Sequence, residues 1–425
     1  MNYERNVSGV RQANEELDFK VTKRHYPRDN NDSILEFIFE KDPNLYMRKN
    51  KIIIRGAIEL PEKVIPDNGF VSKLFTMLTV EVDSQTVSSN RCKYVSLLFT
   101  CAYISFRGEY FLADHMMKIG NFSLNALTSA FHTEGYFYDY HFNDGSDLQL
   151  MPTIKKKIEA RGTLGTLSAG HRRYEFAFIP NNGFLNSPEL LLKNCELKIS
   201  FDRANPNIAL CKIDSGSTAP TKIDIIDCVA ITEYVSSPGI RSFFDVIERQ
   251  PVTYEYEDME VLVKTLPTDS TNIQIDNIRG GNVPNYLFAA VIPSTNLQGV
   301  YDKGATCFKQ HHVEEFNLTL SGNSVSGYPM KVKSNCPTFP MQKFLDTTGH
   351  LHNVFSADTV CHTSFNEWFW FWSHKFEAEN TSQGWLGINL KLTREYTEQM
   401  SLVIWIVSPN GLTIDKYHQI EKINL

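Results

Sequence analysis

Residues 252–257 read Val252-Thr253-Tyr254-Glu255-Tyr256-Glu257, a strict alternation of apolar and polar side chains. Successive side chains of a β-strand point to opposite faces, so this period of two predicts a strand with one face on a core and the other toward solvent or a partner. The same alternation recurs in Leu197–Phe201, Phe316–Leu320 and Ile388–Leu392. We therefore expect mainly antiparallel β-sheet.

Other segments have the continuous apolar character of strands that are buried on both faces. Residues 51–60 and 97–106 are the clearest of these. Clusters of Pro, Gly and Asn, such as Pro409-Asn410-Gly411, separate the strand-like segments and mark turns. The fold class expected from these patterns is all-β with a few short helices.

The length and composition limit the class of protein. The chain has 425 residues, of which 42% are hydrophobic and 12% aromatic, and its net charge is -7. This length exceeds what one hydrophobic core usually serves, so we expect two domains of roughly 200 residues. The negative net charge gives no overall electrostatic basis for binding nucleic acid. The longest apolar run, Leu402–Val407, is about a third of a bilayer span, so no membrane insertion is expected.

Changes of composition divide the chain into four parts. Residues 1–33 are polar and of mixed charge, which predicts a flexible arm. Ser237 and Pro238, followed by apolar residues at helical spacing up to Ile247, predict a short helix that ends before Pro251. The expected parts are a flexible arm over 1–33, a first domain over 34–234, a helical connector over 235–250 and a second domain over 251–425.

The N-terminus and the cysteines favour an intracellular product. The segment Met1-Asn2-Tyr3-Glu4-Arg5-Asn6 has no apolar stretch behind its charges, so no secretory signal is expected. The chain has eight cysteines and no C-x-x-C pair. Such sparse cysteines are typical of reduced, mostly buried thiols.

An aromatic run, Trp368-Phe369-Trp370-Phe371-Trp372, lies within a second candidate helix. Ser364 and Glu367 have capping-box spacing, and apolar rings recur at helical spacing from Phe365 to Phe376. One helix face cannot bury all five rings of the run, so some of them have to meet another layer. The candidates for core or subunit contacts are Trp368, Trp370 and Trp372.

Two further groups are candidate contact surfaces. An aromatic cluster in a long irregular segment is either a lid on the core or an interface anchor, because interfaces concentrate aromatic residues. Its members are Tyr136, Tyr138 and Tyr140. A basic patch follows, which is either a solvated loop or a contact to an acidic neighbour or to packaged nucleic acid. The patch consists of Lys155, Lys156, Lys157, Arg161, Arg172 and Arg173.

One motif resembles a catalytic loop. Asp214-Ser215-Gly216 has the form of an aspartic protease loop, a chemistry that needs two carboxylates sharing one proton. The nearest second copy, Asp346-Thr347-Thr348-Gly349, has one extra residue. Nucleophile, phosphate-loop and metal patterns are also incomplete. We therefore expect no enzyme, cofactor or metal site, and keep a protease centred on Asp214 as an alternative.

Segments of the connector and the second half resemble the major capsid (hexon) proteins of Polinton/Maverick elements and adintovirus-like viruses. The resemblance is strongest from about residue 225 onward, and its motifs are structural. The matching segments are Ser236–Phe244, Leu287–Pro293, Leu402–Val407 and Ile414-Asp415-Lys416.

The resemblance implies a double jelly roll, that is, two eight-stranded antiparallel β-sandwiches in one chain. It also implies a homotrimer that forms a pseudo-hexameric capsomer, capsomers that assemble an icosahedral shell, and location in the virion. A penton or minor capsid protein would be a further partner, and packaged DNA would be contacted only indirectly. A glycan-binding jelly-roll lectin remains a second alternative, because exposed aromatic rings can stack on sugars.

Overall fold

A computed structural model describes most of the strand-forming part of the chain. The described residues are 19–42, 45–61, 64–66, 73–90, 166–168, 170–178, 180, 182–185, 187, 192, 195–212, 220–236, 249–298, 308–333, 336–347, 365, 370–376 and 383–423.

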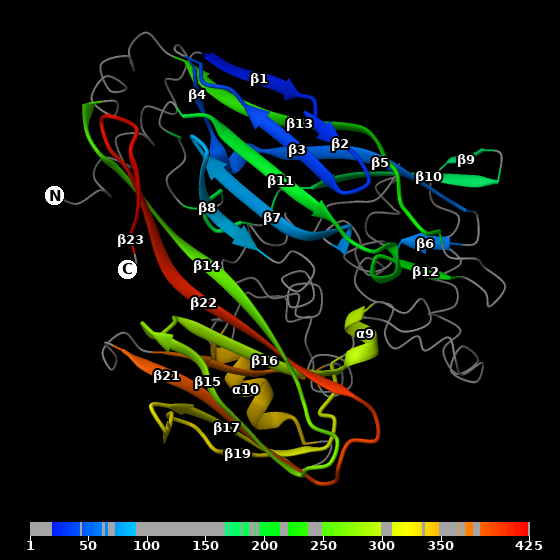
Figure 1. Ribbon diagram of the computed structural model, residues 1–425, viewed down its shortest axis with the longest axis vertical. Coiled ribbons are helices and arrows are strands. Elements are labelled where there is room, and N and C mark those ends of the chain that lie inside the picture. Colours follow the sequence, from blue (N-terminus) through cyan, green and yellow to red (C-terminus); the bar gives the residue numbers. More distant parts are fainter. Residues whose placement is uncertain are drawn as a thin grey trace.

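Two β-sandwiches stand one above the other along the long axis of the molecule (Figure 1). The elements of the first sandwich are β1 (Phe19–His25), β2 (Asp29–Asn30), β3 (Ile34–Phe39), β4 (Tyr46–Met47), η1 (Lys49–Lys51), β5 (Ile53–Pro61), β6 (Val64–Pro66), β7 (Phe75–Val82), β8 (Gln85–Asn90), β9 (Thr166–Ser168), β10 (His171–Phe178), β11 (Leu197–Arg203), η2 (Pro206–Ile208), β12 (Leu210–Lys212) and β13 (Ile225–Ser236).

The second sandwich contains α9 and α10, the α-helices that lie wholly in the described part of the chain. Its elements are β14 (Val252–Thr265), β15 (Asn272–Gly281), β16 (Tyr286–Pro293), α9 (Ser294–Gln298), β17 (Val313–Leu320), β18 (Asn323–Ser324), β19 (Met330–Lys331), α10 (Thr338–Thr347), β20 (Trp372–Lys375), β21 (Gly384–Leu392), β22 (Met400–Ile414) and β23 (Ile420–Ile423).

Both sandwiches have the same order of strands. In the first, the sheets run β1-β13-β5-β10 and β3-β11-β7-β8, and in the second β14-β22-β16-β20 and β15-β21-β17-β18. In each case the first strand pairs with the last, and early and late strands alternate across both sheets. This interleaving of eight antiparallel strands is the jelly-roll arrangement. The prediction of an all-β double jelly roll is therefore confirmed.

One long antiparallel ladder belongs to both sandwiches. Strands β14 and β22 are 14 and 15 residues long and pair from Val252–Ile414 to Thr265–Ser401 with no break in register. Figure 1 shows the two strands rising from the lower sandwich toward the upper one. At one end, Tyr254 lies in the core of the first sandwich, whereas at the other Val261 lies in the core of the second.

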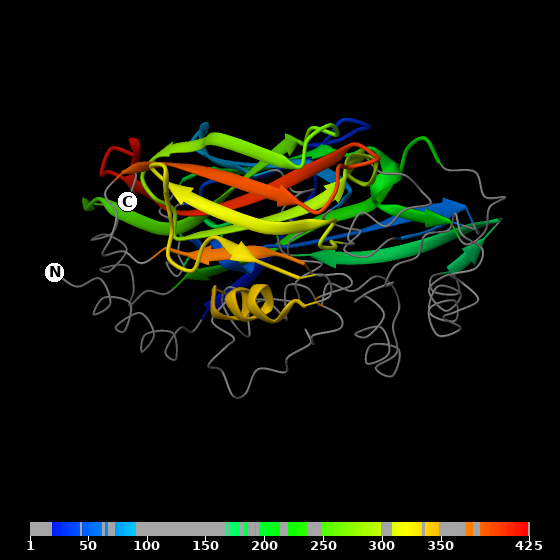
Figure 2. The ribbon, with the colours of Figure 1, turned by 90° about the horizontal axis from the view of Figure 1, so that it is seen from below.

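Tryptophan and phenylalanine rings fill the second core on both faces of β20. Trp372 stacks on Phe316 of the opposite sheet, with ring centroids 4.9 Å apart and planes 6° apart. The neighbouring Phe371 stacks on Phe344 of α10 at 5.4 Å. Helix α10 lies on one outer side of the sheets (Figure 2) and packs on β20. Trp370, Phe371 and Trp372, the part of the aromatic run that the structure describes, are thus buried between a sheet and a helix.

The helix expected from Ser364 to Phe376 is wrong in its second part. Residues Trp372–Lys375 form strand β20, which pairs with β16. A run of consecutive apolar residues fits a strand covered on both faces as well as it fits a helix, and here pairing with β16 decides between them.

The flexible arm expected over residues 1–33 is also wrong in its second half. Strand β1 pairs with β13 over its whole length, from Phe19–Ser236 to His25–Ala230, and β2 pairs with β3. Residues 1–18 lie outside the described part of the chain, as does the expected connector helix over 237–247. The connector was expected to begin at residue 235, but β13 continues to Ser236.

The cysteines and the helices of the described residues bear on two further expectations. Cys195 and Cys228 are buried thiols in no disulfide, as expected of reduced cysteines, whereas the Cys336 thiol is exposed. None of the helices in the described ranges is both long enough and apolar enough to cross a membrane.

Replacing Trp372 with alanine should destabilise the fold by about 3–5 kcal/mol, because the ring is fully buried and stacked on Phe316. The matched control is Trp385→Ala in β21, where the side chain is 50% exposed and a loss of about 0.5 kcal/mol or less is expected. Urea unfolding of both variants checks the prediction. Equal, small losses would contradict the burial of Trp372.

Two truncated proteins should show how much β1 adds to stability compared with the residues before it. Removing residues 1–26 deletes a strand that pairs along seven positions with β13 and carries Lys23, which is 2.6 Å from Asp42. At roughly 1 kcal/mol per hydrogen bond, we expect a loss of about 3 kcal/mol or more relative to removal of residues 1–18. Thermal unfolding of the two truncated proteins measures this difference, and identical melting temperatures would contradict the pairing.

Candidate functional site

The seam between the sandwiches is the part of the structure that makes one body of two domains. Tyr254 and Tyr256 of β14 project into the first core and meet Phe184 edge-on, with ring centroids 5.6 and 5.7 Å apart. Leu412 and Ile414 of β22 join the same core. The first core is therefore completed by residues of the second domain.

A buried lysine lies at this seam. The Lys49 ammonium donates to the carbonyl oxygen of Phe184 at 2.8 Å and to the Ser187 hydroxyl. It also lies over the rings of Phe184 and Tyr254, 5.2 and 5.7 Å from their centroids. Carbonyl oxygens and ring faces stabilise a cation that burial would otherwise disfavour. Lys49 thus links η1 and the segment around residue 185 to β14.

A part-buried carboxyl group lies a few residues further along β14. The Ser88 hydroxyl of β8 donates to Oδ1 of Asp258 at 3.1 Å, and the Asn182 amide donates to Ser88 at 3.0 Å. Burial raises the pKa of Asp258, and the hydrogen bond from Ser88 opposes that rise. Polar side chains of the first domain therefore satisfy a part-buried group of the second.

The backbones of the two domains also approach closely at Gly183. A Cβ atom at this position would lie 1.8 Å from the carbonyl oxygen of Glu257 in β14. That distance is far inside van der Waals contact, and the neighbour is backbone, which cannot rotate away. Only glycine fits at this point of the seam.

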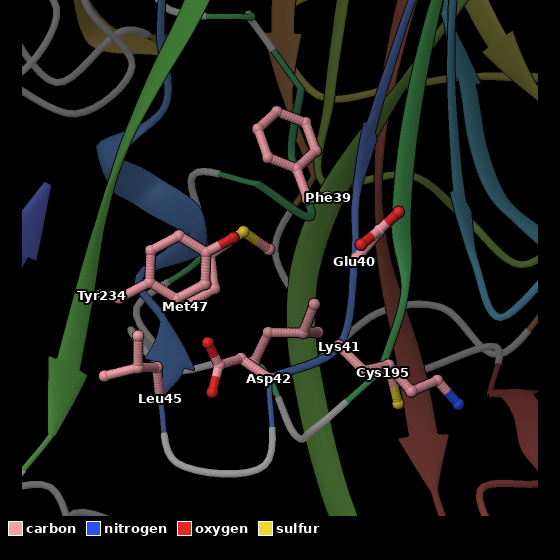
Figure 3. Close-up of a pocket in the computed structure, with 9 residues that line it drawn as sticks. Phe39, Glu40, Lys41, Asp42, Leu45, Met47, Cys195 and Tyr234 are labelled. Atoms are coloured by element: carbon pink, nitrogen blue, oxygen red, sulfur yellow. The ribbon is translucent and has the colours of Figure 1, made fainter. Parts of the chain in front are cut away.

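A small hollow opens on the first sandwich near the seam (Figure 3). The space inside it, including open solvent at its mouth, is about 240 Å³. Asp42 at its edge is paired with Lys23 at 2.6 Å. The lining residues are Phe39, Glu40, Lys41, Asp42, Leu45, Met47, Leu192, Cys195 and Tyr234.

One group of described residues has the ligand types and the spacing for a metal ion. The donor atoms of Asp83, Cys195 and His418 lie within 4.8 Å of one another. Sequence reasoning missed this group, because its members are far apart in the chain and form no spacing motif. The sequence could have indicated only that Asp83 and His418 lie in turns, from the turn-forming residues around them.

Few of the contact residues expected from sequence lie in the described part of the chain. Trp370 and Trp372 are fully buried in the second core, so neither ring is exposed on the single chain. Arg172 and Arg173 lie on β10, and Arg173 pairs with Asp227 at 2.5 Å and with Glu175 at 3.8 Å. The remaining candidates lie outside the described residues: Tyr136, Tyr138, Tyr140, Trp368, Lys155, Lys156, Lys157 and Arg161.

The protease alternative gains no support from the second carboxyl group. Asp214 lies outside the described residues. Asp346, in the nearest second copy of the motif, is on helix α10 and 3.9 Å from Lys343. Aspartic protease chemistry needs two carboxylates that face each other and share a proton. A helical, lysine-paired aspartate lacks the loop geometry for that role.

Gly183→Ala should weaken the seam, because its Cβ collides with the backbone of Glu257. We expect a loss of about 3 kcal/mol in stability, since a clash with backbone in a packed region has to move a strand. The matched control is Gly280→Ala, where a Cβ has open space around it and little change is expected. Urea unfolding measures both, and a stable Gly183→Ala protein would contradict the close approach.

Comparison with known proteins gives one sequence relative and several structures. No family model matches the chain. An uncharacterized protein of Caenorhabditis elegans, F54H12.2, is 20% identical over 305 residues, which cover 69% of this chain. The chain spans 64% of the length of that relative.

Solved structures that are similar to this chain include viral proteins. A chain in the cryo-EM structure of the Sputnik virophage aligns with a TM-score of 0.59 at 11% identity, over 96% of this chain and 88% of that one. The PBCV-1 virus capsid gives 0.57 at 11% identity, over 96% and 97%. The mavirus major capsid protein gives 0.57 at 8% identity, over 95% and 90%. This chain therefore has the double jelly-roll fold of viral major capsid proteins.

Proposed function

We propose that the chain is a structural major capsid protein that trimerises into pseudo-hexameric capsomers, which assemble an icosahedral shell in the virion. The observation that carries the proposal is the repeat of one strand order in two sandwiches of a single chain. Three such chains around a threefold axis present six similar sandwiches. A block of that outline approximates a hexagon, and hexagons can tile a closed shell together with pentagonal units.

The shared ladder supports this role in assembly. A shell subunit transmits contact forces between neighbours, so its two sandwiches need a fixed relative orientation. Here the β14–β22 ladder, the packing of Tyr254 against Phe184 and the hydrogen bond from Ser88 to Asp258 join the sandwiches. Large hydrophobic inter-domain contacts of this kind oppose the domain motion that is otherwise expected within a chain.

The charge distribution favours indirect contact with packaged DNA. The chain has a net charge of -7, and Arg173 of the basic patch is paired with Asp227. Direct binding to the phosphates of DNA requires several basic side chains that are not paired with acidic ones. We place the chain with the capsid proteins of Polinton/Maverick elements and adintovirus-like viruses on the sequence resemblance. A penton or minor capsid protein is then its expected partner at the fivefold positions.

Light scattering of the full-length protein tests the proposal. We expect a species of three times the 48.6 kDa chain mass, and trimers or larger sheets in electron micrographs of the same sample. The comparison variant is Gly183→Ala, in which we expect a smaller trimer fraction because the seam is disturbed. A wild-type protein that stays monomeric at high concentration would contradict the capsid role.

The same preparation separates the alternatives from the capsid proposal. Cleavage of denatured protein at acidic pH by the wild type, lost in Asp214→Asn, would favour the protease. Specific binding on a glycan array by a monomeric protein would favour the lectin.

A further inference from the structure

Three side chains from distant parts of the chain converge beside the hollow of the first sandwich. The Cys195 Sγ is 3.4 Å from the Nδ1 of His418, and this nitrogen is 3.9 Å from the Oδ2 of Asp83. All three donor atoms lie within 4.8 Å of one another. Figure 3 shows Cys195 next to Lys41 at the edge of the hollow.

Local backbone structure fixes the positions of these residues. Asp83 begins the tight turn between β7 and β8, with a positive φ of 42°. Its N–H donates to the carbonyl of Glu196 at 2.9 Å, and the N–H of Glu196 donates to its Oδ1 at 3.0 Å. His418 lies in the turn between β22 and β23, also with positive φ, where Asp415 accepts hydrogen bonds from the backbone N–H groups of Tyr417 and Gln419.

The two oxygens of Asp83 have different surroundings. Oδ1 is 3.0 Å from the Lys41 ammonium and accepts the hydrogen bond from Glu196. Oδ2 is buried and accepts no hydrogen bond of regular geometry, and it is the oxygen that faces His418. Burial alone would raise the pKa of Asp83, but the Glu196 amide and Lys41 are the largest of the contributions that outweigh it and lower the pKa. The carboxylate is thus ionised and oriented by neighbours, as metal ligands usually are.

The donor types indicate the class of ion. A thiolate, an imidazole and a carboxylate together suit Zn²⁺, whereas Ca²⁺ and Mg²⁺ prefer oxygen ligands alone. On binding, the Cys195 thiol gives its proton to solvent, and neutral His418 binds through Nδ1. The charges of the thiolate and of Asp83 then balance those of the ion. Lys41 lies behind Oδ1 and is 49% exposed, so water screens its charge.

We propose that Asp83, Cys195 and His418 bind one Zn²⁺ ion, with water in the fourth position. The ion joins two segments of the first sandwich to the turn between β22 and β23. It therefore fastens the C-terminal part of the chain to the first sandwich, at the end of the ladder that enters its core. This site is independent of the capsid role.

Metal titration of the full-length protein tests the site. After treatment with a chelator, the protein should bind Co²⁺ with a thiolate charge-transfer band in the near ultraviolet. Zn²⁺ should displace that ion and raise the melting temperature, because it binds the native state only. The site variants are Cys195→Ser and His418→Asn, and asparagine tolerates positive φ. Each should abolish the band or weaken Zn²⁺ binding by about tenfold or more.

Matched controls exist for both variants. Cys336→Ser removes an exposed free thiol, and His312→Asn makes the same change at another histidine with positive φ. Neither should alter the band or the affinity. A band that persists in Cys195→Ser, or a wild type whose melting temperature ignores Zn²⁺, would overturn the proposal. If Cys195→Ser fails to fold, an unchanged Zn²⁺ affinity in His418→Asn overturns the zinc proposal. The trimer content of the same samples tests the capsid role separately.

Discussion

The register of the β14–β22 ladder constrains the whole molecule. Side chains alternate between the faces of a strand, so a slip by one residue would turn every inward ring outward. In this ladder the slip would remove Tyr254 from the first core and Val261 from the second at once. The unbroken pairing from Val252–Ile414 to Thr265–Ser401 is therefore enforced by two cores together. Neither sandwich can repack this ladder without the other.

The seam extends this dependence with a buried lysine and a part-buried aspartate. Hydrophobic contacts alone would tolerate small sliding, because they have no preferred direction. The Lys49 ammonium lies over the ring of Tyr254 in β14, and Asp258 of β14 accepts a hydrogen bond from Ser88 of the first sandwich, whose loss would be costly. Together with the glycine contact at Gly183, they fix one orientation of the sandwiches. For a shell subunit, a fixed orientation lets contacts at one sandwich position the next.

The sequence predicted the strands better than their partners. Alternation in residues 252–257 identified a half-buried strand, but its tyrosines enter the first core, and no local pattern says which core a face will meet. Strand β1 was missed because its lysines and arginine resemble a solvated arm, whereas pairing with β13 holds it in place. The prediction of a helix around Trp372 was wrong because five consecutive aromatic residues fit the period of a helix and that of a strand equally well. The group of Asp83, Cys195 and His418 depends on tertiary contacts alone.

The comparisons indicate what maintains this fold. Chains that are 8–11% identical to this one share its fold over 95–96% of its length. The order of the strands and their pattern of buried residues are therefore enough to specify the fold. The shared fold alone does not fix the residues of the outer faces. If the chain assembles as proposed, its subunit contacts therefore depend on side chains that this shared fold does not specify. The same argument applies to the Asp83 group: Asp83 and His418 lie in turns and Cys195 lies just before β11, where the ladder pattern imposes no residue type.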